Sequence, residues 1–343
     1  MRLVPKSEPH GSTVMVLFAT RGVAISALSD WACACAARRP YLGVVAPLPT
    51  DPREMRKVLG LMGEAHAFCV ALAEGIPSML HRIPSREALS EAQKTVHLLC
   101  ERAAVWMRSL TSLTRYTDYQ AHSAACRALF ELAVDVTLIV SEPALVERMW
   151  AWEESAKLKS CNRYVAYVRR TNLANPNSTK MGFPQRNEAV VKELRRQHWG
   201  HDRHPPTWFG VPFEQVVAEA DRRARSSTST SEAWSSYEET YAKNYDELCW
   251  GTHGSSLAMI RQPVSADYIA AIALHAMGES SRLGLELAAR AAAFLGLDGT
   301  SIFRELFENM QAMREEFCRK FSAESGPSDL EGAAPQSAGV QDG

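Results

Sequence analysis

The most constraining feature of this sequence is the helical spacing of its apolar residues along most of its length. Apolar side chains recur every three or four residues, the period of an α-helix that buries one face. The segments are 53–75, 84–112, 118–141, 143–170, 186–198, 212–225, 229–261, 264–295 and 298–321. No run of alternating β-branched residues is long enough to require a strand, and no internal repeat indicates a solenoid. The pattern predicts an all-α fold, a bundle of about eight or nine helices with no sheet.

Residues that favour helix ends mark several of these boundaries. Three serines are predicted to be N-caps: Ser85, Ser141 and Ser265. Two glycines are predicted to end their helices: Gly75, shortly before Pro77, and Gly296.

Composition and residue patterning predict the domain organisation. The chain is 46% hydrophobic and 22% charged, as in an ordinary globular protein, and its net charge of -1 gives no overall attraction to nucleic acid or membrane. Residues 1–52 lack clean periodicity and are expected to form a poorly ordered or loosely packed extension. Residues 322–343 are rich in small residues, proline and acids, and are expected to be a disordered tail. A single helical domain is predicted over 53–321.

The compartment is predicted from the cysteines and from one apolar stretch. The eight cysteines are scattered without a C-x-x-C pair, which is typical of reduced thiols in a cytoplasmic protein. The apolar stretch 14–28 is interrupted by Arg21 and is shorter than a membrane span, so no membrane association is expected.

The predicted helix over 126–140 is apolar almost all round but carries three charges at four-residue spacing. Arg127, Glu131 and Asp135 form one polar stripe on a helix that is expected to be buried. Charges taken into a core must be paired, and Arg127 can pair with Glu131 along the helix. Two interpretations stay open: a structural ion network that joins helices, and a buried polar site.

A second helix, over 237–257, carries polar groups along one ridge. The ridge consists of Tyr237, Tyr241, Tyr245, Cys249 and His253, each four residues from the next. The histidine is either a core residue bonded to a neighbouring helix or an imidazole that lines a small polar cavity. The candidate polar site therefore comprises Arg127, Glu131, Tyr241, Tyr245 and His253.

Three motifs in order along the chain resemble those of a known family. They are R-x-x-x-E in an apolar helix, W-F-G-V-P-F-E-Q-V-V-A-E-A, and Y-x-x-x-Y-D-E-L-C-x-x-x-H-G. Together they resemble a bacterial all-helical family catalogued as domain of unknown function family 5677, over roughly residues 90–300. The matching positions are Arg127, Glu131, Trp208, Tyr241, Tyr245 and His253, and Cys249 stands where the family pattern has a serine. The family has no established activity, so the resemblance implies a fold and a polar cluster but no reaction.

Basic residues gather between 157 and 204. This segment holds eleven Lys and Arg against three acids and has aromatic residues interleaved, which suits phosphate contact and base stacking. Two helices joined by a loop over 171–184 are expected to form a basic hairpin arm. Candidate nucleic-acid contacts are Arg169, Arg170, Arg195 and Arg196. The alternative is a solvated hairpin whose charges neutralise acidic neighbours.

Three histidines at even spacing, His198, His201 and His204, raise the question of a metal site. Gly200 and the following Pro-Pro pair make one continuous helix through all three unfavourable, and no recognised ligand spacing lies nearby. We expect no metal here. The stretch is predicted to be a helix end and a stiff turn, after which Trp208 enters the core. No phosphate-binding or dinucleotide motif is present in the sequence, so no cofactor is expected.

Two functional hypotheses from different classes remain. The first is a non-enzymatic helical module that binds a partner protein or small-molecule ligand through the polar cluster. The second is a metal-independent ribonuclease, with RNA as its partner, that uses Arg and His at the spacing of Arg115 and His122 or of Arg196 and His201. Arg127 and His253 could supply the same two groups from different helices. A histidine in an open basic cleft favours the nuclease, and a sealed histidine favours the binding module.

Overall fold

A computed structural model of the chain describes residues 52–83, 85–115, 118–227, 236–245, 248–249 and 266–298. Every regular element in these ranges is a helix, which confirms the all-α prediction. The expectations for residues 1–51 and for 299–343, including the last predicted helix and the tail, lie outside the described residues.

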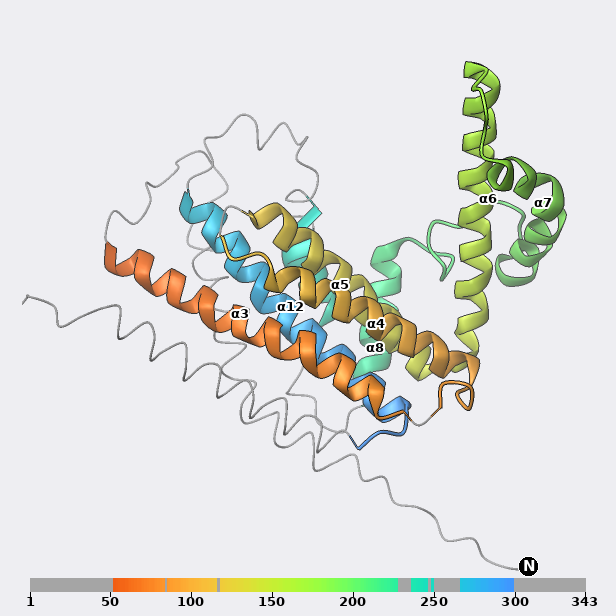
Figure 1. Cartoon of the computed structure of the whole chain (residues 1–343). Helices are drawn as coiled ribbons and strands as arrows, with labels where there is room; N and C mark the ends of the chain where they lie inside the picture. Colours follow the sequence, from red (N-terminus) through yellow and green to blue (C-terminus); the bar gives the residue numbers. More distant parts are fainter. Residues whose placement is uncertain are drawn as a thin grey trace, which may run out of the picture.

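Four long helices form the main bundle (Figure 1). They are α3 (Pro52–His81), α4 (Glu91–Thr111), α5 (Tyr119–Ser141) and α12 (Ala266–Phe294). The last of them packs against each of the other three, so a segment far along the chain completes the bundle that the first three helices begin.

The core follows from the composition of α5. Leu129, Phe130 and Ala133 are fully buried, and most of its other apolar residues are nearly so. This extensive burial agrees with a helix that carries apolar side chains almost all round. The free energy gained is about 25 cal/mol for each Å² of apolar surface removed from water. The same core continues into α8 (Phe213–Ser227) through Val216, Val217 and Ala220.

Two further helices form a hairpin that projects from one end of the bundle (Figure 1). They are α6 (Val146–Thr171), which follows the short 3-10 turn Pro143–Leu145, and α7 (Ser178–Trp199). Their shared interior is a small apolar cluster of Leu158, Cys161, Phe183 and Val191, separate from the main core.

The predicted start of α4 and the predicted end of α3 were wrong. The N-cap of α4 is Ser90 and not Ser85, because Ser90 and Gln93 form a reciprocal capping box: Gln93 N donates to Ser90 Oγ at 3.2 Å. Gly75 does not end α3, which continues through Pro77 to His81. Since Ile76, Met79 and Leu80 are buried in the core, their burial offsets the hydrogen bond that the proline removes.

Of the other predicted boundaries, Gly296 is confirmed and Ser141 is wrong. Gly296 lies just after α12 with a φ of 72°, as expected of a helix-ending glycine. Ser141 is the last residue of α5 rather than the N-cap of the next helix, and Ser265 lies outside the described residues. The loop of the hairpin arm covers only 172–177, because Asn177 caps α7 by accepting from Lys180 N at 3.0 Å.

Candidate functional site

The predicted pairing of Arg127 with Glu131 is present on α5. Arg127 Nε donates to Glu131 Oε1 at 2.9 Å, and Tyr245 Oη donates to the same oxygen at 2.8 Å. The guanidinium also lies over the Tyr245 ring, 5.3 Å from its centroid. The Arg127 and Glu131 side chains are 30% and 42% exposed, so this cluster is not buried as predicted. Water at the edge of α5 lowers the desolvation cost that a fully buried pair would carry.

Tyr241 extends this cluster by stacking on Tyr245, with ring centroids 4.9 Å apart. Both rings belong to the π-helical turn Tyr241–Tyr245, which follows the short helix α9 (Tyr237–Thr240). His253, the remaining predicted member, lies outside the described residues. Burial, followed by the charge of Glu131, raises the pKa of Tyr245, so its hydroxyl stays a proton donor at neutral pH. The described cluster is thus internally hydrogen-bonded and has no group poised to move a proton.

A buried ionic network on α12 was missed by the sequence analysis. Glu286 is 1% exposed and accepts from Arg282 Nη1 at 3.2 Å and from Arg290 Nη2 at 3.1 Å. Arg282 also binds Glu279 and donates to Thr240 Oγ1 at 3.1 Å. The sequence does contain a signal for this network, because Glu279, Arg282, Glu286 and Arg290 recur every three or four residues in an apolar helix.

Tyr237 joins the α12 network to α5. Its hydroxyl donates to Glu286 Oε1 at 2.6 Å and lies 2.8 Å from Thr137 Oγ1. The ridge of tyrosines predicted from the sequence is therefore divided: Tyr237 lies inside the bundle, and Tyr241 and Tyr245 lie at its edge.

Asp135, the third charge of the predicted stripe, has a different partner. Its Oδ1 accepts from Trp208 Nε1 at 2.7 Å, and Trp208 enters the core as predicted. Burial raises the pKa of Asp135 to about 7, although the Trp208 hydrogen bond and the Arg102 charge oppose the shift. This carboxyl group and the indole fix the segment after α7 against α5.

The histidine-rich stretch is a helix end and a turn that are held to α6 through Ser155. His204 Nδ1 lies 2.7 Å from Ser155 Oγ, and Arg195 Nε donates to the same oxygen at 2.7 Å. Gly200 ends α7 in the left-handed conformation with a φ of 73°, as the helix-end prediction requires. Ser155 is fully buried and therefore cannot act as a nucleophile toward a substrate. In the part of the chain that the structure describes, no three His, Cys, Asp or Glu residues are placed to share a metal ion.

The four arginines proposed to contact nucleic acid have different environments. Arg195 is only 8% exposed, so the prediction that it contacts a phosphate is wrong; its Nη1 donates instead to the Asp202 carbonyl at 2.9 Å. Arg196 is exposed and pairs with Glu193 at 2.9 Å. Arg169 and Arg170 are exposed in the last turn of α6.

The arginine and histidine pairs of the nuclease hypothesis do not form an open site in the described residues. His122 is fully buried and its Nε2 lies 3.2 Å from the Leu113 carbonyl oxygen. Burial lowers the pKa of His122, which keeps the ring neutral, but the ring has no access to a substrate. His201 is exposed beyond the end of α7, where Arg196 is already paired with Glu193.

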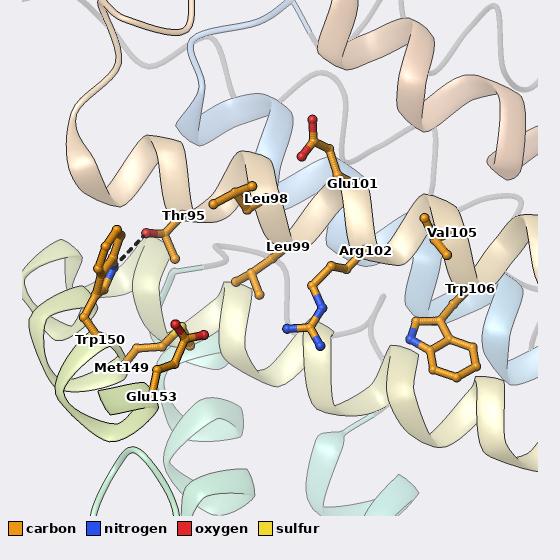
Figure 2. Close-up of a pocket in the computed structure, with 10 residues that line it drawn as sticks. All are labelled: Thr95, Leu98, Leu99, Glu101, Arg102, Val105, Trp106, Met149, Trp150 and Glu153. Carbon is orange, nitrogen blue, oxygen red and sulfur yellow. Dashed lines mark hydrogen bonds between the residues drawn. The ribbon is translucent and has the colours of Figure 1, made fainter. Parts of the chain in front are cut away.

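A groove that the sequence analysis did not anticipate lies between α4 and α6 (Figure 2). Its volume is about 500 Å³, and its lining is mostly apolar. Three of its large apolar side chains are unusually exposed: Leu98 at 41%, Val105 at 57% and Trp150 at 50%. Exposed apolar side chains that share one groove are typical of an interaction site, whereas single ones are not.

A tryptophan lies at each end of this groove, and charged side chains lie between them. Trp150 Nε1 donates to Thr95 Oγ1 at 3.3 Å and so fixes the indole at one end, while Trp106 lies at the other (Figure 2). Arg102 projects from α4 among the lining residues and makes no ion pair with a residue that the structure describes, although its charge acts to lower the pKa of Asp135. Glu153 lies on the α6 side, also without an ion pair there. A third charged lining residue, Glu101, is paired with Arg86 at 3.9 Å. The groove therefore offers an apolar surface with one cation, Arg102, and one anion, Glu153, that make no ion pair with a described residue.

Comparisons with known proteins do not add to this description. No protein-family model matches the chain, and neither the curated proteins nor the solved structures include a significant match. The relationship to domain of unknown function family 5677 stays a prediction. No helix among the described residues has the length and apolar character needed to cross a bilayer.

Proposed function

We propose that this chain is a non-catalytic helical module that binds a partner protein through the groove between α4 and α6. The observation that carries the proposal is the joint exposure of Leu98, Val105 and Trp150 along one groove. Leu98 and Val105 are seven residues apart on α4, which places them on the same helix face two turns apart. Burying such side chains against a partner gains roughly 1.5–3 kcal/mol each.

The groove selects the chemistry of its occupant. The lining residues run from Thr95 to Trp106 along α4, about 16 Å at 1.5 Å per residue, which suits one face of a helical or extended peptide segment. Arg102, which makes no ion pair with a described residue, favours a carboxylate in that segment, and Glu153 on the α6 side favours a basic group. The occupant is thus an apolar segment of a partner protein that carries one acidic and one basic residue.

The polar cluster of Arg127, Glu131 and Tyr245 gives little support to a binding function. Arg127 Nε and Tyr245 Oη both donate to Glu131 Oε1, and a partner would have to displace these bonds. A ribonuclease is not favoured by any described contact, because His122 is sealed in the core. A cytoplasmic location is part of the same proposal and rests on the cysteine pattern alone.

Selection from a displayed library of random peptides, with the purified full chain as bait, tests this function. Peptides enriched on the wild type are expected to share apolar residues three or four positions apart, with an acidic residue among them. They should bind the Val105→Glu variant at least about tenfold more weakly, because the carboxylate would be buried against apolar groups.

The matched control is Val190→Glu, which changes an equally exposed valine on the outer surface of α7. Selected peptides should bind this control like the wild type. Equal binding to the wild type and to Val105→Glu would overturn the proposal, as would a failure to enrich any shared pattern. Cleavage of a mixed RNA substrate in EDTA by the wild type, lost in a folded Arg127→Ala variant, would instead establish the nuclease.

A further inference from the structure

The outer face of α6 carries a basic stripe that the groove does not use. The stripe consists of Lys159, Arg163, Tyr167 and Arg170, spaced by four, four and three residues and therefore aligned along one helix face. All four side chains are exposed, and Tyr167, one turn before the end of α6, is 46% exposed.

The stripe faces away from α7. The buried residues Leu158, Cys161 and Val168 mark the side of α6 that packs on its neighbour, and the stripe lies on the opposite side by the 3.6-residue period. None of its three cations makes an ion pair with a residue that the structure describes. The positive charge is therefore presented to solvent rather than used to join the two helices.

Along the chain, the charge next to the stripe is of one sign. No Asp or Glu occurs between Glu154 and Glu188, a segment that includes seven Lys and Arg. The two glutamates of α7 are already bound within it, Glu188 to Lys192 at 2.8 Å and Glu193 to Arg196 at 2.9 Å. A projecting helix with such a local excess attracts polyanions even though the whole chain is nearly neutral.

We propose that this stripe on the α6–α7 hairpin binds single-stranded nucleic acid, with the three cations on phosphates and Tyr167 stacked against a base. Lys159 and Arg170 are eleven residues apart, about 16 Å along the helix, enough to track a few consecutive phosphates. An exposed aromatic ring between cations favours a nucleic acid over an acidic protein, because a base can stack on the face of the ring. The site is independent of the groove and does not rest on the function proposed for it.

Fluorescence anisotropy with a labelled single-stranded uridine 20-mer RNA and the full chain tests this site. The wild type should bind with an affinity that falls steeply with salt. The triple variant Lys159→Gln, Arg163→Gln, Arg170→Gln should bind at least about tenfold more weakly, with a log–log salt slope lower by about 2, since each phosphate contact contributes about 0.7.

The ring is tested separately from the charge. Tyr167→Ala should weaken binding about fivefold or more with no change in salt slope, and Tyr167→Phe should bind like the wild type, because stacking needs the ring and not the hydroxyl. The control for charge is the triple variant Arg86→Gln, Arg108→Gln, Arg115→Gln. It removes an equal number of positive charges from exposed positions outside the hairpin.

Three results would overturn the proposal. One is an absence of RNA binding by the wild type at 50 mM salt. Another is an equal loss of affinity in the control triple variant, which would show attraction by overall charge only. The third is unchanged RNA binding by Tyr167→Ala together with full competition by polyglutamate, which would identify the stripe as a surface for an acidic protein.

Discussion

Tyr237 donates a 2.6 Å hydrogen bond to Glu286, across 49 residues of sequence, at a point where both side chains are almost completely removed from water. The bond joins the segment after α8 to α12, and Thr137 on α5 completes the contact. A carboxylate held by two arginines and a phenol in a core is stable only because each of its partners is in place. The stability of the bundle should therefore depend on this hydroxyl group.

Replacement of Tyr237 by phenylalanine removes only that hydroxyl. Because the bond is made to a charged acceptor, we expect the free energy of unfolding in urea to fall by about 1.5–3 kcal/mol. Tyr167→Phe, which removes a hydroxyl from the exposed face of α6, should leave it within about 0.5 kcal/mol. Equal stability of Tyr237→Phe and the wild type would contradict the structural role assigned to this bond.

The pH dependence of stability should report the raised pKa of Asp135. Its pKa of about 7 in the folded chain lies above the value of about 4 expected when unfolded. The folded state therefore holds the proton to higher pH, and stability is lost as the pH rises from about 4 to about 7, by a few kcal/mol in order of magnitude.

Asp135→Asn removes this titration but keeps an oxygen that can accept from Trp208. The variant should be more stable than the wild type at pH 8 and should lose the difference on going to pH 4, as followed by urea unfolding at each pH. The exposed Glu193→Gln change serves as the control and should not alter the pH profile of stability in this way. A constant difference between Asp135→Asn and the wild type across this range would exclude the assignment.

Two glycines of α12 should respond in opposite ways to replacement by alanine. A Cβ at Gly278 meets no atom within 4 Å, so Gly278→Ala should stabilise the helix by about 0.5–1 kcal/mol. A Cβ at Gly284 would overlap the Met107 side chain, which is fully buried, so Gly284→Ala should destabilise by about 1–3 kcal/mol. Thermal unfolding measures the stability of both variants. A stabilised Gly284→Ala would show that α4 packs less tightly on α12 at Met107 than in the structure.

The attachment of α7 to α6 should depend on Arg195. Its guanidinium donates to Ser155 Oγ and to the Asp202 carbonyl oxygen, and alanine would leave both oxygens without this donor. Arg195→Ala should increase amide hydrogen exchange in α7 at least about tenfold while exchange in α5 stays unchanged, because the hairpin core is separate from the main one. The exposed neighbour Arg196→Ala is the control, and equal exchange in both variants would remove the special role of Arg195.

The sequence by itself determined the features that depend on helical period. The all-α class, the Arg127–Glu131 pair and the entry of Trp208 into the core follow from the spacing and type of neighbouring residues. The extension of α3 past Pro77 did not, because the burial of apolar residues beyond the proline decides it and burial depends on other helices.

Only the tertiary structure decided which polar groups meet and which surfaces remain open. Tyr237 and Tyr245 are equivalent in the sequence pattern, yet one is sealed beside Glu286 and the other lies at the edge beside Glu131. The groove between α4 and α6 is likewise invisible in either helix alone. The physical reason is that local period fixes the face on which a side chain lies, whereas the packing of distant helices fixes what that face meets.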